Sequence, residues 1–198
     1  MKYFLIIATT FSLNFTNLTT LPDSKSVIGF VGGPWTLLNY ATGKKTNLSL
    51  KWKTKYLKDV IIPLLDKNIN LQLDAGAEKV MILDSGVSNM SEMYFKKYYV
   101  DLLQPLIKED VGYYTKQLNK RCLPTLYKMN WSGLGLDSSV DIIHAFKKYK
   151  KGFIQGNFDE SLLLQDEQEC RKSIQQFLEK MEVVDKRGWV CGLGHGIN

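Results

Sequence analysis

The chain has 198 residues, of which 44% are hydrophobic and 12% aromatic, so it is long enough for one globular domain with a sizeable core and is unlike a disordered chain. Its net charge of +6 could suit nucleic acid, but Lys and Arg are scattered among acidic residues instead of forming one basic stripe with interleaved aromatics. The composition therefore favours a solvated basic surface and no nucleic-acid partner, and it would also suit a polycarboxylate ligand.

The first twenty residues are an ambiguous segment. Lys2 and the apolar run over residues 3–8 resemble a short secretory signal, which would make the protein a secreted binder. However, Asn14 and Asn17 follow without a small-x-small cleavage site, and the run is far shorter than the ~20 residues that span a membrane. We therefore expect a buried or frayed end of the domain and no membrane partner.

Cysteine usage bears on the compartment. Cys122, Cys170 and Cys191 are too few and too widely spaced for a disulfide framework, and none belongs to a Cys-x-x-Cys pair. This pattern indicates a reducing environment, and we expect the protein to be cytoplasmic.

Short apolar runs alternate with helical patterns along the chain. No repeat, linker or low-complexity tract separates them, so residues 1–198 are expected to form a single domain. Runs of this length suit strands that are buried on both faces. We predict strands over residues 26–31, 79–83, 123–129, 133–136, 152–154 and 189–193.

Three segments have the periodicity of amphipathic helices. Apolar residues recur at every fourth position from Leu57 to Leu73, and Gly76 is expected to end that helix with a left-handed cap. Ser91 is expected to cap a second helix, while Pro63 and Pro105 should kink or restart the helices that contain them. The predicted inner faces of the second and third helices are Phe95, Tyr99, Leu102 and Leu106, and Cys170, Ile174, Phe177, Leu178 and Met181.

Alternating strands and helices imply an α/β fold with a parallel sheet, either doubly wound or a (β/α)8 barrel. Polar residues follow several predicted strands directly, and in a barrel that end of the strands is the catalytic rim. The chain has neither a Gly-x-Gly-x-x-Gly turn after a strand nor a Gly-x-x-x-x-Gly-Lys-Ser loop, which removes the main support for a nucleotide-binding open sheet. The polar residues in question are Asp84, Ser85, Asp137, Ser138, Asn157, Asp159 and His195.

Five short sequence blocks occur in a fixed order. They are residues 29–37 (GFVGGPWTL) with Tyr40 beyond them, 75–77 (AGA) with 82–85 (ILDS), 135–137 (GLD), 155–159 (QGNFD) and 193–197 (LGHGI). In these blocks the chain resembles the uroporphyrinogen decarboxylase family. The resemblance covers residues 26–197 and implies an incomplete TIM-type (β/α)8 barrel made of the family's later strands and helices.

Other parts of the family pattern are not found. The opening motif Arg-Gln-Ala-Gly-Arg-Tyr and an early strand ending in Ser-Asp, which carries the family's key aspartate, are absent, and the chain stops at Asn198 where the family continues into a closing helix. The connection from Met129 to Gly133 also looks too short for a helix, which predicts that one strand–helix unit has been lost. The resemblance therefore implies a barrel that lacks some catalytic groups.

The family's reaction converts uroporphyrinogen to coproporphyrinogen, in haem biosynthesis, without a cofactor or metal. A pyrrole ring is protonated and becomes an electron sink, carbon dioxide leaves an acetate side chain, and the exposed carbon is reprotonated. This chemistry requires an anion near the developing pyrrole cation and donors that hold the substrate carboxylates in a shielded cleft.

The resemblance assigns roles to three residues. Tyr40 matches a catalytic tyrosine whose hydroxyl lies near the reacting acetate, with an aromatic on a helix face as its less favoured structural alternative. Ser85 matches a substrate-binding serine, with an N-cap role as its structural alternative. His195 matches a substrate-binding histidine, and Gly194 and Gly196 beside it would let a ligand approach closely. Asn157 and Asp159 are expected mainly to fix a loop and cap the next helix.

Two alternatives remain open. A related zinc-dependent cobamide methyltransferase would need His-x-Cys and a later Cys, but Tyr127 and Met129 stand at the first pair and His195 at the third position, so no zinc site is expected. The other alternative is a non-catalytic remnant or split half with open sheet edges. The expected partners are uroporphyrinogen as a small-molecule substrate and either a second copy of the chain or a complementing N-terminal fragment.

Overall fold

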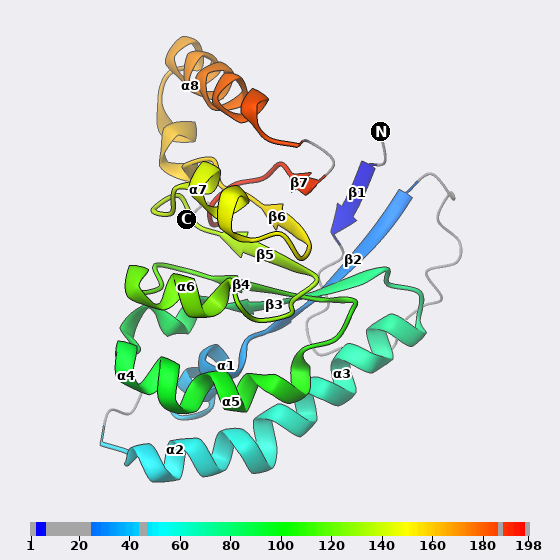
Figure 1. The fold of residues 1–198 in the computed structure, drawn as a ribbon, viewed down its shortest axis with the longest axis vertical. Coiled ribbons are helices and arrows are strands. Elements are labelled where there is room, and N and C mark those ends of the chain that lie inside the picture. Colours follow the sequence, from blue (N-terminus) through cyan, green and yellow to red (C-terminus); the bar gives the residue numbers. More distant parts are fainter. Residues whose placement is uncertain (1–2, 7–24, 44–46, 186–187, 197–198) are drawn as a thin grey trace.

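The protein is described by a computed structural model that covers residues 3–6, 25–43, 47–185 and 188–196. Its centre is a sheet of parallel strands whose spatial order is the sequence order, β1 to β7 (Figure 1). Each crossover therefore steps to the next strand in the same direction, as in a barrel, whereas a doubly wound sheet reverses direction. The strands are β1 (Tyr3–Ile6), β2 (Lys25–Gly32), β3 (Lys79–Asp84), β4 (Val111–Thr115), β5 (Gly133–Leu136), β6 (Phe153–Gln155) and β7 (Trp189–Val190).

The sheet is an incomplete barrel of the TIM type, as the sequence predicts. Among the described strands no pairing joins β7 back to β1. The helical segments are α1 (Pro34–Ala41), α2 (Leu50–Tyr56), the π-helical turn η2 (Leu57–Ile61), α3 (Ile62–Asp74), η3 (Ser85–Asn89), α4 (Glu92–Tyr94), η4 (Phe95–Tyr99), α5 (Val100–Leu103), η5 (Gln104–Leu106), η6 (Lys120–Cys122), α6 (Leu123–Leu126), α7 (Ile142–Lys148), η7 (Glu160–Leu164), α8 (Glu167–Lys180) and η8 (Met181–Val183).

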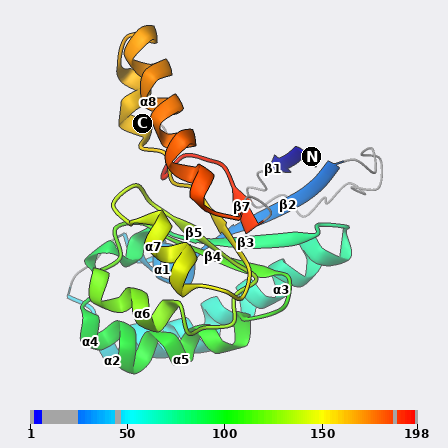
Figure 2. The ribbon, with the colours of Figure 1, turned by 45° about the horizontal axis from the view of Figure 1, so that its top comes forward.

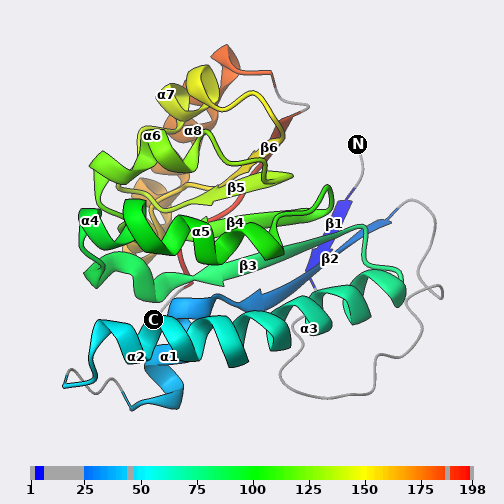
Figure 3. The same cartoon turned by 60° about the horizontal axis from the view of Figure 1, so that its bottom comes forward.

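The core lies between the strands and the helices that follow them. Figure 3 shows α3 and α5 running along the same side of the sheet. Strand residues such as Ile82, Tyr113 and Leu134 are fully buried, and helix residues Ile69 and Phe95 are fully buried opposite them. Each such side chain contributes roughly 1.5–3 kcal/mol by leaving water. This packing fixes the carboxyl ends of β2 to β5, where the candidate site is built.

Local signals in the sequence are confirmed. Gly76 has a φ of 104°, the left-handed conformation expected just after α3. The Ser91 hydroxyl accepts a hydrogen bond from the Tyr94 backbone nitrogen at 3.2 Å and so caps α4. Pro63 lies in the first turn of α3 and Pro105 in the 3₁₀ turn η5, so both prolines restart a helix.

The predicted strand over residues 123–129 is wrong. Its first residues form the short helix α6, and the strand is instead β4, whose aromatic residues lie between β3 and β5. A seven-residue apolar run does not distinguish a strand from a buried helix, and Pro124 supplies no backbone donor for a sheet. The predicted loss of a strand–helix unit between Met129 and Gly133 is therefore also wrong, because β4, α6 and β5 form a complete unit.

The C-terminal end is less deeply packed than the sequence indicates. No residue of α8 is buried, and the predicted inner-face residues Ile174 and Leu178 are 37% and 44% exposed. Figure 2 shows α8 projecting away from the rest of the molecule. Phe177 is its main anchor, with edge-to-face contacts to Phe158 at 5.4 Å and Trp189 at 5.8 Å between ring centroids. The last strand is also shorter than predicted, since β7 ends at Val190 and Leu193 makes only an isolated bridge to Phe158.

The N-terminal segment is described only in part. Residues 3–6, which begin the apolar run, pair in parallel with β2, whereas residues 7 and 8 of the run and the rest of the first twenty residues lie outside the described residues. Within the described part of the chain, no helix has the length and apolar character needed to cross a membrane. The three cysteines are free thiols.

Candidate active site

The three residues predicted for the site line one cavity. Tyr40 comes from α1, Ser85 from the start of η3 and His195 from the loop after β7, and together they border a cavity of about 620 Å³ at the carboxyl ends of the strands. The other lining residues are Trp35, Thr36, Asn39, Lys53, Gly86, Ser88, Asn89, Lys116 and Gln117. Side chains from distant parts of the sequence thus meet at the end of the sheet where barrel enzymes bind ligands.

Asp84 connects α1, which carries Tyr40, to the end of β3, where Ser85 follows. This last residue of β3 has no exposed surface, and one carboxylate oxygen accepts bonds from the backbone nitrogen and the hydroxyl of Thr36, both at 2.9 Å. The other oxygen accepts bonds from the hydroxyls of Tyr99 and, at 2.8 Å, Tyr113. The carboxylate therefore caps the N-terminus of α1 from another element, since Gly33 at the N-cap has no side chain to do so.

This buried network shifts the pKa values of its members. Burial raises the pKa of the Asp84 carboxyl above its ordinary value, and the hydrogen bonds from Tyr99, Thr36 and Tyr113 only partly oppose the rise. Burial, followed by the nearby Asp84 carboxylate, raises the pKa of the Tyr99 and Tyr113 hydroxyls well above their usual range. Both phenols therefore remain protonated and able to donate at neutral pH.

Gly33 is required by the close approach of α1 to β3. A Cβ atom at this position would lie 2.2 Å from the Cβ of Asp84, a distance that no packed side chain tolerates. The backbone nitrogen of Gly33 also donates to the carbonyl of Leu83 at 2.7 Å. The glycine in the GFVGGPWTL block thus allows the turn from β2 into α1 to sit directly on the end of β3.

Tyr40 and Ser85 differ in how far they are enclosed. Tyr40 is in the last turn of α1 and is 75% exposed, so its ring lies on the solvent-facing side of that helix. Ser85 is partly buried and begins η3, whose N-cap position is occupied by Asp84, so the alternative of Ser85 as an N-cap is wrong. In the described part of the chain the Ser85 hydroxyl has no hydrogen-bond partner, which leaves it available to a ligand.

His195 is positioned by the backbone of Gly194. The Gly194 nitrogen donates to the carbonyl of Phe158 at 2.7 Å, and its carbonyl accepts from the Tyr114 hydroxyl at 2.8 Å. A Cβ on Gly194 would lie 2.5 Å from the Ser138 nitrogen, so only glycine fits here. Burial raises the pKa of the Tyr114 phenol, which keeps its hydroxyl a donor.

Asn157 and Asp159 fix loops, as the sequence predicts, and Asp137 does so as well. Asn157 donates from its side chain to the carbonyls of Asp137 and Val140, both at 2.8 Å. The Asp159 carboxylate accepts from the Ser161 nitrogen at 3.0 Å and caps η7. Asp137 accepts from the Gln117 nitrogen at 2.7 Å, which ties the end of β5 to the end of β4.

Two lysines that line the cavity were not predicted as site residues from the sequence. Lys53 lies on α2, far from any strand end, so the rule that searches strand ends does not reach it. Lys116 follows β4 directly, and it was missed because β4 itself was missed. No Asp or Glu side chain is among the described residues that line the cavity.

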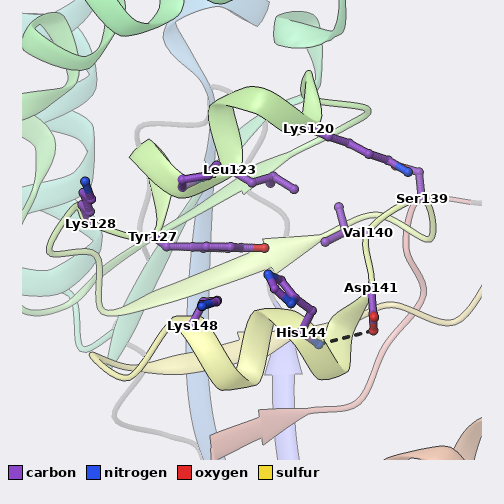
Figure 4. Close-up of a pocket in the computed structure, with 10 residues that line it drawn as sticks. Lys120, Leu123, Tyr127, Lys128, Ser139, Val140, Asp141, His144 and Lys148 are labelled. Carbon is purple, nitrogen blue, oxygen red and sulfur yellow. Dashed lines mark hydrogen bonds between the residues drawn. The ribbon is translucent and has the colours of Figure 1, made fainter.

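A second cavity of about 590 Å³ lies on the helical side of the molecule, between α6 and α7 (Figure 4). Leu123 and Val140 are among the residues that line it, and the ring of Tyr127 lies between the two helices. None of the three candidate site residues lines it. Tyr127 thus lies at a different cavity from His195, and the described residues hold no group of three or more His, Cys, Asp or Glu side chains suited to a metal.

The fold agrees with solved barrel proteins. A methyltransferase from Methanosarcina mazei aligns with a TM-score of 0.66 at 17% identity, covering 90% of this chain and 55% of that one. A B12-independent methionine synthase from Shewanella sp. W3-18-1 aligns with a TM-score of 0.58 at 12% identity, covering 86% of this chain and 56% of that one. The fold and the rim cavity together define a protein of the parallel α/β-barrel class.

Sequence relatives narrow this class to one family. The uroporphyrinogen decarboxylase (URO-D) family model matches residues 13–198, and the chain belongs to that family. The uroporphyrinogen decarboxylase of Aquifex aeolicus is 31% identical over 192 residues, covering 88% of this chain and 56% of the relative. That of Rickettsia bellii is 28% identical over 201 residues, covering 89% and 56%. The chain thus spans about half the length of these relatives.

Proposed function

We propose that this chain supplies the later half of a uroporphyrinogen decarboxylase-type carboxy-lyase, which converts uroporphyrinogen to coproporphyrinogen in cytoplasmic porphyrin biosynthesis without a cofactor. The observation that carries the proposal is the meeting of Tyr40, Ser85 and His195 at one rim cavity. Family membership supports the reaction class. Because the chain spans about half the length of its relatives, the proposal concerns the assembled enzyme.

Each of the three residues has a separate part in this proposal. Ser85 and His195 donate hydrogen bonds to carboxylates of the substrate, from the η3 side and the β7 side of the cavity. Tyr40 places its hydroxyl beside the acetate that loses carbon dioxide. The described lining residues offer hydroxyl, amide, imidazole and ammonium groups and no carboxylate, which suits a ligand that carries many negative charges.

The reaction also needs an anion beside the protonated pyrrole, and the described residues that line the cavity do not provide one. Asp84 is the nearest carboxyl along the chain to Ser85, but it has no exposed surface and both of its oxygens are engaged by Thr36 and the two tyrosines. Tyr40 is also too exposed for a reaction that must exclude water. We therefore propose that a further segment, either a complementing N-terminal half or a second copy of the chain, supplies the anion and covers Tyr40.

The test is complementation. The full chain is assayed for coproporphyrinogen formation from uroporphyrinogen, alone and mixed with the N-terminal half of the Aquifex aeolicus relative, with chromatography of the oxidised products as the readout. We expect activity in the mixture and little in the chain alone. In the mixture, Tyr40→Phe and His195→Gln should each lower the rate by on the order of 10²-fold.

His144 is the matched control, because it is the chain's other histidine and lines the second cavity, between α6 and α7. His144→Gln should leave the rate of the mixture unchanged. Equal losses from His195→Gln and His144→Gln would contradict the assigned site.

A non-catalytic remnant is the second candidate, and it is favoured by the exposed Tyr40 and by the lack of a carboxylate among the lining residues that the structure describes. A remnant would bind uroporphyrin without turning over uroporphyrinogen in any mixture. A chain that neither binds nor reacts would overturn both candidates.

A further inference from the structure

The rim cavity contains two ammonium groups that come from different parts of the fold. Lys53 enters from α2 and Lys116 from the end of β4, and no carboxylate among the described lining residues balances them. Another lysine of α2 differs in this respect. Lys55, two residues from Lys53, is paired with Asp59 at 2.5 Å on the outer surface. The charges of Lys53 and Lys116 are therefore available to an anionic ligand.

Lys53 is held against a fixed aromatic wall. Its Nζ lies 5.8 Å from the centroid of the Trp35 ring, a cation–π distance. Trp35 is itself only 8% exposed, and its backbone nitrogen donates to the Tyr99 hydroxyl at 2.9 Å. Tyr99 in turn donates to Asp84, so the wall beneath Lys53 belongs to the buried network. The ammonium group is therefore restricted before any ligand arrives, which lowers the entropy cost of binding.

Lys116 is placed by the turn that ends β4. Thr115 before it is 1% exposed, and Gln117 after it has a φ of 49°, in the left-handed region that a side chain seldom adopts. The Gln117 nitrogen donates to the buried carboxylate of Asp137 at 2.7 Å, which holds the turn in place. Lys116 is thus fixed on the strand end while its side chain borders the cavity.

We propose that Lys53 and Lys116 form a carboxylate-binding pair that selects a tetrapyrrole bearing acetate groups over one whose acetates have become methyl groups. The proposal rests on the proposed function and names two specificity residues of the same cavity. An ammonium is a compact charge with three donors, so it accepts carboxylates at several orientations. Two such charges at separate points of the wall favour the ligand with the greater number of carboxylates, so conversion of the acetates to methyl groups would weaken binding of the product.

The experiment measures equilibrium binding to the full chain with two stable oxidised porphyrins. Uroporphyrin carries an acetate on each pyrrole ring, whereas coproporphyrin carries methyl groups there, and the shift of the porphyrin absorption band reports binding without relying on Trp35. We expect Lys53→Gln and Lys116→Gln each to raise the Kd for uroporphyrin about tenfold, with a much smaller effect on coproporphyrin. Lys53→Arg should retain most of the affinity, because the charge and the contact with Trp35 remain.

Lys55→Gln is the matched control, since it removes the same charge from the same helix outside the cavity. A loss of affinity as large in Lys55→Gln as in Lys53→Gln would mean that bulk charge is responsible and would overturn the inference. Wild-type binding that is unchanged in both cavity variants would overturn it while leaving the proposed function intact. If the wild type binds neither porphyrin, the proposed function and the inference both fall. Thermal unfolding of each variant confirms that the fold is retained.

Discussion

Two regions contribute to the candidate site, and they are held in place very differently. The β3–α1 region rests on a buried carboxylate with four hydrogen bonds and on a continuous core. The β6–α8–β7 region has a two-residue last strand and a helix without a buried residue. Tyr40 and Ser85 belong to the first region, and His195 belongs to the second. One side of the cavity is therefore preformed by the core, while the other depends on a few bonds around Gly194.

The two regions should therefore differ in local stability. Local stability is lowest where few apolar contacts are buried, so the His195 side is expected to open more readily than the Asp84 side. Under the proposed function, we expect the tetrapyrrole to enter past the weaker side, which leaves the buried network undisturbed. The following variants test this division of stability.

The largest loss is expected for Asp84→Ala. Removal of the carboxylate leaves the Thr36 nitrogen and the Tyr99 and Tyr113 hydroxyls without their acceptor in the core, so the free energy of unfolding should fall by about 4 kcal/mol. Urea denaturation measures the loss. Asp101→Asn, at an exposed position on α5, should change stability by less than about 0.5 kcal/mol. A small loss in Asp84→Ala would show that the network does not stabilise this region.

The next largest loss is expected for Gly33→Ala. The added Cβ would overlap the Asp84 side chain and push α1 away from β3, at a cost of about 2–3 kcal/mol. Binding of uroporphyrin should weaken with it, because α1 carries Tyr40. Gly192→Ala is the control, since a Cβ there meets no atom within 4 Å. Equal stability of the two variants by thermal unfolding would rule out close packing as the reason for glycine at position 33.

A smaller effect is expected for the pH dependence of the free energy of unfolding, which reports one proton at the Asp84 carboxyl. Burial raises its pKa in the folded protein, so the fold binds this proton more tightly than the unfolded chain does. The stabilisation is fully present below the unfolded pKa and is lost as pH rises through the folded pKa. The stability of Asp84→Asn should lack this decline when urea denaturation is repeated across acidic pH. Parallel pH curves for the two proteins would contradict the raised pKa.

The smallest global effect is expected for Tyr114→Phe. Loss of the bond to the Gly194 carbonyl should cost about 1 kcal/mol and should act mainly on the loop that carries His195. Hydrogen exchange should become faster in the segment around Gly194 while the Asp84 region remains protected. Tyr98→Phe, at a partly exposed tyrosine on η4, is the control and should leave the loop unchanged. Uniform exchange changes across the chain would argue against two separate regions.

Much of the fold follows from patterns that the sequence carries locally. Three such patterns act within a few residues, and each is confirmed. They are the apolar residue at every fourth position from Leu57 to Leu73, the helix cap at Ser91 and the left-handed conformation of Gly76. The strand β4 was missed because its neighbours decide it: Tyr113 is buried by stacking on Trp131 at 4.9 Å, a contact that no local rule supplies. The exposure of α8 also escaped prediction, because an amphipathic pattern shows which face could be buried and not what packs against it.

The sequence by itself determined the alternation of strands and helices, the family, and the three residues that meet at the rim, because those signals reside in short motifs and in their order. Only the tertiary structure decided that the strands follow one another as in a barrel and that Asp84 caps α1 from another element. It also decided that Lys53 and Lys116 share the cavity with Tyr40. Each of these depends on contacts between residues far apart in the chain, and such contacts are set by how the elements pack together.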